Sequence, residues 1–393
     1  MESALSGLRV LEIGHVVSAP FCGAMLADFG AEVIKVEAPG SGDLLRNMGN
    51  FKNMWFAVED RNKKTITLDL KSEKGKELFF SLVKTSDVLI ENFRPGALKK
   101  LGIDWEVVHK VNPRLIMVSV SGYGQTGPYY KKPGYDRLGM AMGGLTYLTG
   151  FPDGAPIRPG LAVSDYMTGL FALNGTLTAL YYRDHGGNVG QHIDASLYES
   201  VLRIMEATLV DYSYKGVVRE RIGNAHISTI PGGHYLTKDQ QYIVLAVGGD
   251  KIFAQFVKSI GREELAKDER YATAKARSEH RAEIEAMTIK WIGEHTKEEC
   301  LAAFGDDIPN GLIYTVEDIF NDPHIKAREN IVTLDTDEFG TISMQGIVPK
   351  LSETPGKVKW AGPPMGAYNE EVYMGVLGLS EEEYKQYRSD GII

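Results

Sequence analysis

The start of the chain carries a strand-helix-strand pattern, and this feature restricts the fold more than any other. Residues 8–13, Leu-Arg-Val-Leu-Glu-Ile, are typical of a buried strand, and residues 32–36 are typical of a second one. Between them, Pro20 suits the first turn of a helix, and the apolar run to Phe29 ends at Gly30, a common residue at helix C-termini. Because two strands joined by a helix run parallel, this start predicts an α/β fold.

The alternation continues for another hundred residues. Strand patterns recur at 65–70, 87–90 and 115–120, and helical patterns lie between them at 73–84 and 96–101. Regular alternation of this kind is typical of a parallel sheet with helices on both faces. We therefore predict a doubly wound, Rossmann-like large domain.

The length of 393 residues suits two domains better than one. A hairpin pattern at 234–247 precedes charged amphipathic helices at 251–304, and this change of character indicates a smaller α+β domain. The predicted boundaries are 1–195 with 331–393 for the large domain, 226–325 for the small domain, and 196–225 and 326–330 for linkers.

The charge distribution indicates a phosphorylated small ligand. The net charge of −9 argues against general affinity for nucleic acid. Residues 61–100 nevertheless hold ten Lys or Arg against five Asp or Glu, and a basic segment near glycine turns suits a phosphate group. For Lys74 and Lys76 alone, a solvated helix face is the better interpretation.

Cysteine usage and hydropathy bear on the location of the protein. Cys22 and Cys300 form no disulfide framework and have no metal-ligand spacing, so we expect no metal and a reduced, cytoplasmic setting. The apolar stretch 170–182 is interrupted by polar residues and is short for a membrane span. We therefore expect no association with a membrane.

An N-terminal strand-helix-strand unit often binds a dinucleotide, but the first turn of this chain does not fit such a site. Residues 14–20 read Gly-His-Val-Val-Ser-Ala-Pro and lack the Gly-x-Gly-x-x-Gly pattern. Without the second glycine, close approach of the backbone to a pyrophosphate is not specified. Glu37 stands where an acidic ribose ligand would, yet it does not replace the missing glycines.

Asp165 precedes a long helical pattern, and two interpretations of it stay open from local sequence. An acidic residue before a helix is most often an N-cap. A carboxylate beside glycine turns and a basic segment, without metal or redox motifs, also suits a covalent nucleophile acting on a large anionic substrate.

Short motifs along nearly the whole chain together resemble the class III CoA-transferases, the formyl-CoA and carnitine CoA-transferase family. The motifs keep the order and spacing of that family. They are the strand 8–12 with the turn at His15, Ala31 to Glu37, Glu91 to Gly96, Ser121 to Pro128, Gly134 to Asp136, Asp165, Gly190 to Asp194, Gly223 to His226, and Gly248 to Asp250.

The resemblance implies that the large domain binds coenzyme A, which enters as an acyl-CoA substrate, and that no cofactor is held permanently. It also implies a homodimer with interlinked chains. Asp165 would be the catalytic residue. The implied CoA-binding residues are His15, Val16, Leu70, Lys71, Asn92, Phe93, Arg94 and Tyr135, and the implied active-site loop residues are Val17, Gly248 and Gly249.

In this interpretation Asp165 attacks the donor thioester and forms an acyl-aspartyl anhydride, and CoA then gives an aspartyl-CoA thioester. The α-methylacyl-CoA racemases are an alternative on the same fold, because they keep a matching Asp. Their second acid/base is a His in a Gly-His-Asp triplet, whereas this chain has Tyr135 there. Tyrosine, with an ordinary pKa of about 10, is poorly matched to removing an α-proton near neutral pH.

The sequence leaves the two exchanged acids open. Val17 stands where formyl-CoA transferases have Gln, which argues against a small diacid such as oxalate. Tyr198, Met205, Tyr212 and Tyr214 indicate a roomy apolar pocket for a bulkier acid. A non-catalytic CoA-binding protein is a third possibility, but the retained Asp165 argues against it.

Overall fold

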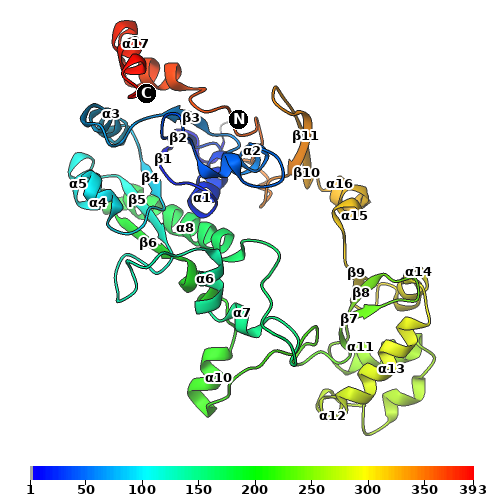
Figure 1. Ribbon diagram of the computed structural model, residues 1–393. Helices are drawn as coiled ribbons and strands as arrows, with labels where there is room; N and C mark the ends of the chain where they lie inside the picture. Colours follow the sequence, from blue (N-terminus) through cyan, green and yellow to red (C-terminus); the bar gives the residue numbers. More distant parts are fainter. Residues whose placement is uncertain (1–2) are drawn as a thin grey trace. The chain divides into compact units, whose positions relative to one another are not determined.

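The computed structural model describes residues 3–393 and divides them into two compact units. The large unit contains the chain up to Thr146, Arg158–Val217 and Ile325–Ile393, and the small unit contains Tyr147–Ile157 and Val218–His324. The large unit is built on a six-stranded, wholly parallel sheet (Figure 1). The predicted α/β fold class is therefore confirmed.

The strand order of this sheet is β3-β2-β1-β4-β5-β6. The order reverses between β1 and β4, and such a reversal opens a crevice for ligands at the carboxyl ends of the strands. The sheet therefore places a candidate site beyond the ends of β1 and β4. The six strands are β1 (Arg9–Glu12), β2 (Glu32–Glu37), β3 (Lys64–Thr67), β4 (Val88–Glu91), β5 (Ile116–Ser121) and β6 (His192–Ser196).

Apolar cores cover both faces of the sheet, because alternate strand residues point to opposite sides. On β1, Val10 joins a core formed with helices α1 (Ser18–Asp28) and α8 (Val163–Tyr182). The neighbouring Leu11 joins the opposite core, whose helices are α3 (Glu73–Lys84), α5 (Trp105–Val111) and the C-terminal α17 (Glu381–Ser389). The sheet is thus doubly wound, as predicted.

Short helices and one hairpin complete the large unit. The hairpin pairs β10 with β11, and the last helix begins at the capping box of Ser380 and Glu383, as its sequence predicts. The remaining elements are η1 (Leu44–Asn47), α2 (Met54–Glu59), α4 (Ala97–Leu101), α6 (Asp136–Met142), α7 (Leu145–Leu148), η2 (Arg183–Gly187), α9 (Leu197–Arg203), α10 (Thr208–Lys215), α16 (Pro323–Ala327), β10 (Ile331–Thr336), β11 (Gly340–Gln345) and η4 (Glu371–Val376).

The small unit packs helices around an antiparallel sheet of order β7-β8-β9. Its own core contains Phe253, Phe256, Ile284 and Phe304. The hairpin expected at 234–247 is present as β7 and β8. The elements are β7 (Gly232–Leu236), β8 (Tyr242–Ala246), α11 (Asp250–Ser259), η3 (Glu263–Lys267), α12 (Ala274–Glu279), α13 (Arg281–Gly293), α14 (Lys297–Phe304), β9 (Asn310–Leu312) and α15 (Val316–Asn321).

Within residues 3–393, no helix has both the length and the apolar character needed to cross a membrane.

Candidate active site

Asp165 is the third residue of helix α8, whose N-cap position is held by Ala162. The Asp165 side chain therefore does not cap the helix, and the N-cap interpretation is wrong. Its carboxylate is half-buried and accepts no hydrogen bond from any residue in the range 3–393. A carboxylate in this position is available to react with a ligand.

Burial raises the pKa of Asp165 to about 7, and the nearby negative charge of Asp136 adds to the rise. Both effects disfavour the ionised form. A carboxylate with a pKa near neutrality is a stronger nucleophile than an ordinary aspartate and is still partly ionised at working pH. Such perturbed groups cluster at functional sites.

Asp136 holds the start of α8 from outside the helix. Its carboxylate accepts the Ser164 N–H at 2.9 Å, and the Ser164 hydroxyl donates to the Asp136 carbonyl, also at 2.9 Å. The second carboxylate oxygen lies 3.8 Å from the Arg158 guanidinium. Asp136 therefore fixes the helix end that carries Asp165 and influences its charge.

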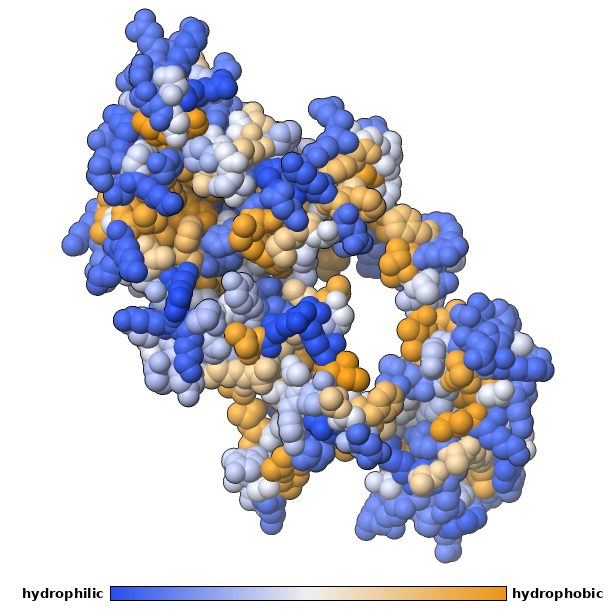
Figure 2. All heavy atoms as spheres, in the orientation of Figure 1, coloured by the Kyte–Doolittle hydropathy of each residue, from blue (hydrophilic) through white to orange (hydrophobic). Residues whose placement is uncertain are grey.

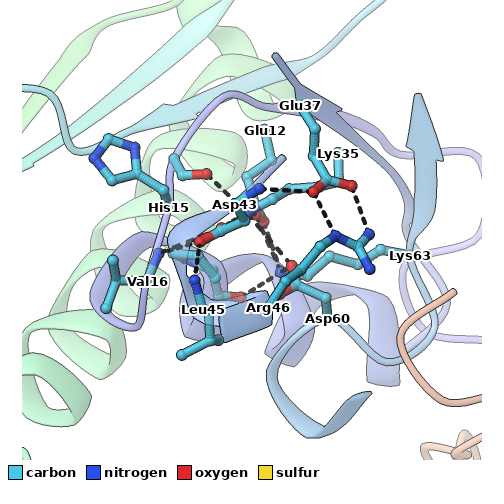
Figure 3. A network of polar contacts seen from close by, with 12 residues as sticks. Glu12, His15, Val16, Lys35, Glu37, Asp43, Leu45, Arg46, Asp60 and Lys63 are labelled. Carbon is cyan, nitrogen blue, oxygen red and sulfur yellow. Dashed lines mark hydrogen bonds and ion pairs between the residues drawn. The ribbon is translucent and has the colours of Figure 1, made fainter. Parts of the chain in front are cut away.

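The turn Gly14–Val17 joins β1 to α1 and is held on both sides. Asn92 accepts the His15 N–H at 2.9 Å and donates to the His15 carbonyl at 2.7 Å. The Asp43 carboxylate accepts the Val16 N–H at 3.0 Å (Figure 3). Val16 has φ 67°, which a β-branched residue rarely adopts, so these bonds fix a strained turn.

The turn packs against the segment of α8 that carries Asp165. Val17 belongs to a small buried cluster, and Val16 and Tyr166 pack against that cluster. The Tyr166 hydroxyl donates to the buried Glu59 carboxylate at 2.6 Å, so the residue after Asp165 is also fixed. The turn and Asp165 thus belong to one site.

A cleft of about 260 Å³ opens at the carboxyl ends of β1 to β4, at the crevice that the strand order predicts. Four of the residues predicted to bind CoA line it: His15, Leu70, Lys71 and Phe93. The His15 and Phe93 rings meet edge to face, with 5.1 Å between centroids. Burial lowers the pKa of His15, so its ring is neutral at pH 7.

A second cleft, of about 950 Å³, shares Phe93 with the first and continues past β4 and β5. Arg94 lines it and donates through Nε to the Lys131 carbonyl at 2.7 Å. Lys99, Lys100 and Lys131 lie along the same cleft. Lys74 and Lys76 instead pair with Glu77 and Glu73 on the exposed face of α3, which agrees with the solvated helix face expected for them.

The other predicted residues lie elsewhere. Tyr135 is 75% exposed and directly precedes Asp136. Gly248 and Gly249 belong to the small unit, where they join β8 to α11 and Gly249 has φ 81°. Tyr212 and Tyr214 are 62% and 76% exposed on α10, whereas Met205 is buried.

Sequence reasoning missed three residues of this site. Asp136 was noticed only as the end of a triplet, although its carboxylate affects Asp165. Lys35 lies within the motif Ala31 to Glu37, which gave it no role, and Asp43 lies in a loop without a motif; only their contacts reveal their importance. The one local signal was a lysine inside the buried strand β2, where a charge requires a partner.

Comparison with known proteins identifies the family. The profile of CoA-transferase family III matches residues 5–369. The succinyl-CoA–D-citramalate CoA-transferase of Chloroflexus aurantiacus is 42% identical, covering 99% of this chain and 98% of that protein. The succinyl-CoA–L-malate CoA-transferase beta subunit of the same organism is 41% identical over the same shares. A crystal structure of a CaiB/BaiF family protein from Brucella suis, 34% identical, covers 96% of this chain and 100% of that chain, with a TM-score of 0.85. The chain therefore belongs to CoA-transferase family III and is a CoA-transferase.

Proposed function

We propose that this enzyme moves CoA from an acyl-CoA donor to a carboxylic acid acceptor through covalent intermediates on Asp165. The observation that supports this most is the Asp165 carboxylate itself. It is half-buried, its pKa is raised to about 7, and it accepts no hydrogen bond within residues 3–393. The next residue, Tyr166, packs against the same small cluster as Val16 and Val17 of the turn, and Gly14 and His15 of that turn line the cleft.

The first half of the reaction loads the enzyme. An Asp165 oxygen attacks the donor thioester carbonyl, the C–S bond breaks, and CoA leaves as a thiolate. The thiolate then attacks the aspartyl carbonyl of the resulting anhydride, and the donor acid leaves as a carboxylate. Asp165 now carries CoA as a thioester.

The second half reverses these steps with a different acid. The acceptor carboxylate attacks the aspartyl carbonyl and releases the CoA thiolate, which leaves a new anhydride on Asp165. The thiolate attacks the acceptor acyl carbonyl, forms the new acyl-CoA, and frees Asp165. Because anhydrides hydrolyse, water must be excluded, a role we assign to Val17, Gly248 and Gly249.

We assign the nucleotide and pantetheine of CoA to the two joined clefts. Lys71 and Arg94 carry positive charge there, and an Arg fork suits a phosphate. Phe93 lines both clefts, so it would contact CoA where they meet. Further contacts are proposed for His15, Val16, Leu70, Asn92 and Tyr135.

We propose that the exchanged acids are dicarboxylates. The two Chloroflexus aurantiacus relatives are named for succinyl-CoA and for hydroxydicarboxylate acceptors. Arg158 is 3.8 Å from Asp136, the carboxylate that acts on the charge of Asp165, and its side chain is 38% exposed. It is therefore a partly exposed cation beside Asp136, and we propose that it binds the second carboxylate of the substrate.

The racemase alternative finds no support among the named relatives, which are CoA-transferases. Tyr135 also replaces the histidine of that reaction. Incubation with a 2-methylacyl-CoA in deuterated water tests it: transfer without α-deuterium incorporation is expected.

We further propose a cytoplasmic homodimer with interlinked chains. Large apolar side chains are exposed on α8 and α10, which is unusual for a surface facing water (Figure 2). They include Leu170, Phe171, Leu177, Leu209 and Val210. Light scattering after size exclusion should give a dimer at low protein concentration, and a stable, active monomer would contradict the proposal.

The proposed cytoplasmic location rests on the cysteines. Both cysteines are free and buried, which suits a reducing compartment.

The decisive experiment looks for the covalent intermediate. Wild-type enzyme mixed with succinyl-CoA alone should carry CoA or succinate on the peptide that contains Asp165, and hydroxylamine should trap it as a hydroxamate. Asp165→Ala and Asp165→Asn should fold and show neither adduct nor transfer. Transfer by pure Asp165→Ala protein would end the covalent proposal.

A further inference from the structure

A cluster of buried charges lies beside the Gly14–Val17 turn (Figure 3). Lys35 on β2 and Lys63 are its cations, and Glu12, Asp43 and Asp60 are its carboxylates. The Lys35 and Lys63 residues are 1% and 0% exposed. Burying charges is costly, and for stability alone a well-packed apolar cluster would serve as well.

The Lys35–Asp43 pair contacts the turn at two backbone positions. The Lys35 ammonium donates to Asp43 Oδ2 and to the Gly14 carbonyl, each at 2.7 Å. Asp43 Oδ1 accepts the Val16 N–H at 3.0 Å and the Leu45 N–H at 2.8 Å. The pair therefore grips the turn on either side of His15, while Asn92 holds His15 itself.

The surroundings favour the charged forms of both Lys35 and Asp43. Burial opposes ionisation of Asp43, but the Lys35 ammonium outweighs it and lowers the pKa of Asp43 to about 2. Burial likewise opposes protonation of Lys35, but three carboxylates raise its pKa well above the ordinary value. Both side chains are therefore charged at pH 7, and their bonds to the turn are charge-assisted.

The turn needs these hydrogen bonds because the backbone of Val16 is strained. At φ 67°, a valine side chain crowds its own backbone, at a cost that the surroundings must offset. If the bonds to Gly14 and Val16 were lost, Val16 would relax to a negative φ. The turn would then shift, and with it the residues Gly14 and His15 that line the cleft and the valines that pack near Tyr166. Geometry errors of this kind reduce the rate of a positioned reaction sharply.

We propose that Lys35 and Asp43 are positioning residues for CoA transfer, whose buried ion pair holds the Gly14–Val17 turn in its strained, reactive conformation. This inference rests on the proposed function, since it takes the turn to face the reacting CoA ester. Neither side chain touches the reacting atoms; each acts through the backbone of the turn.

Lys35→Met and Asp43→Asn test the proposal. Lys35→Met removes the ammonium, and we expect kcat per folded enzyme to fall about 10²-fold, more than KM for acyl-CoA rises. Asp43→Asn keeps an oxygen for the Val16 N–H but loses the charge facing Lys35, so a smaller loss is expected. The matched control is Asp28→Asn, which disrupts the buried Arg61–Asp28 pair at the other end of α1 without contacting the turn. It should lower stability but not kcat.

Rescue by glycine separates positioning from general stability. Glycine adopts φ near 67° without strain, so Val16→Gly in the Lys35→Met background should restore kcat about tenfold. A crystal structure of Lys35→Met should show residue 16 outside the left-handed region. If Lys35→Met does not fold, the same comparison is made with Asp43→Asn, alone and combined with Val16→Gly.

Two results would overturn the inference: folded Lys35→Met with the kcat of wild type, or a kcat loss that Asp28→Asn reproduces and Val16→Gly does not rescue. Failure of the underlying function is distinguishable, because then the wild-type enzyme itself would form no adduct on Asp165.

Discussion

The Asp136 carboxylate accepts the backbone N–H of Ser164, the residue directly before Asp165, at 2.9 Å. One buried acid thus fixes the helix end that carries another acid, the proposed nucleophile. The same proximity places a negative charge near Asp165, and this charge contributes to its raised pKa. Position and reactivity of Asp165 are therefore coupled through Asp136.

The raised pKa predicts how the rate depends on pH. In the proposed mechanism the attacking form is the Asp165 carboxylate, whose pKa is about 7, so kcat/KM for acyl-CoA should fall about tenfold per pH unit below pH 7. Asp136→Asn removes a negative charge and should move this acid limb to lower pH. Initial rates from pH 5 to 9 give both profiles. An unshifted limb in Asp136→Asn would show that burial alone sets the pKa.

The same shift predicts a stability change. The folded pKa of about 7 exceeds the unfolded value of about 3.9, so the wild type loses stability as pH rises from about 4 to 7. Asparagine does not titrate. Asp165→Asn should therefore gain roughly 2 to 4 kcal/mol relative to wild type across this window, with no further gain above it. Urea unfolding at pH 4, 6 and 8 measures the difference, and a constant difference would contradict it.

Arg94 should bind the nucleotide end of CoA. Arg94→Ala should raise KM for acyl-CoA about tenfold and leave kcat nearly unchanged, because the lost contact is the same in ground and transition states. Lys74→Ala is the control, since Lys74 pairs with Glu77 on the exposed face of α3. Equal KM values for the two variants would show that Arg94 is a surface charge that does not bind CoA.

Arg158 should recognise the second carboxylate of a dicarboxylate. Arg158→Gln should raise KM for succinate or malate as acceptor about tenfold, the value of one charge-assisted hydrogen bond. Butyrate, which lacks the second carboxylate, should be used equally by both proteins. If the substitution weakens both acids alike, Arg158 acts through Asp136 and not on the substrate.

The regular parts of the fold were predictable because they repeat a local pattern. The strand ranges from residue 8 to residue 120 and the helix at 73–84 follow from alternating or helical apolar positions. The membership of residues 147–157 in the small unit has no such signal, since it depends on contacts with residues after 218, such as Gly223 with Gly150. Asp165 was found through family motifs, whereas its place inside α8 depended on where the helix begins.

The site was predictable only where motifs mark it. His15, the adjacent Leu70 and Lys71, and Phe93 come from three distant parts of the sequence. The parallel sheet gathers them because each part follows the carboxyl end of a strand. No motif marks Asp43, and the motif that contains Lys35 assigns it no role. Their importance comes from a distance of 2.7 Å between two side chains, and no pattern along one chain encodes that distance.

Gly169 lies one turn beyond Asp165 on α8, where it meets α1. A Cβ added there would come within 2.8 Å of the Phe21 ring and 2.9 Å of the Ser18 carbonyl. The missing side chain lets α8 and α1 approach closely here, and α1 begins directly after the Gly14–Val17 turn. A larger residue at position 169 would push α8 away from α1, and in the proposed mechanism this would move Asp165 away from the turn beside which it reacts.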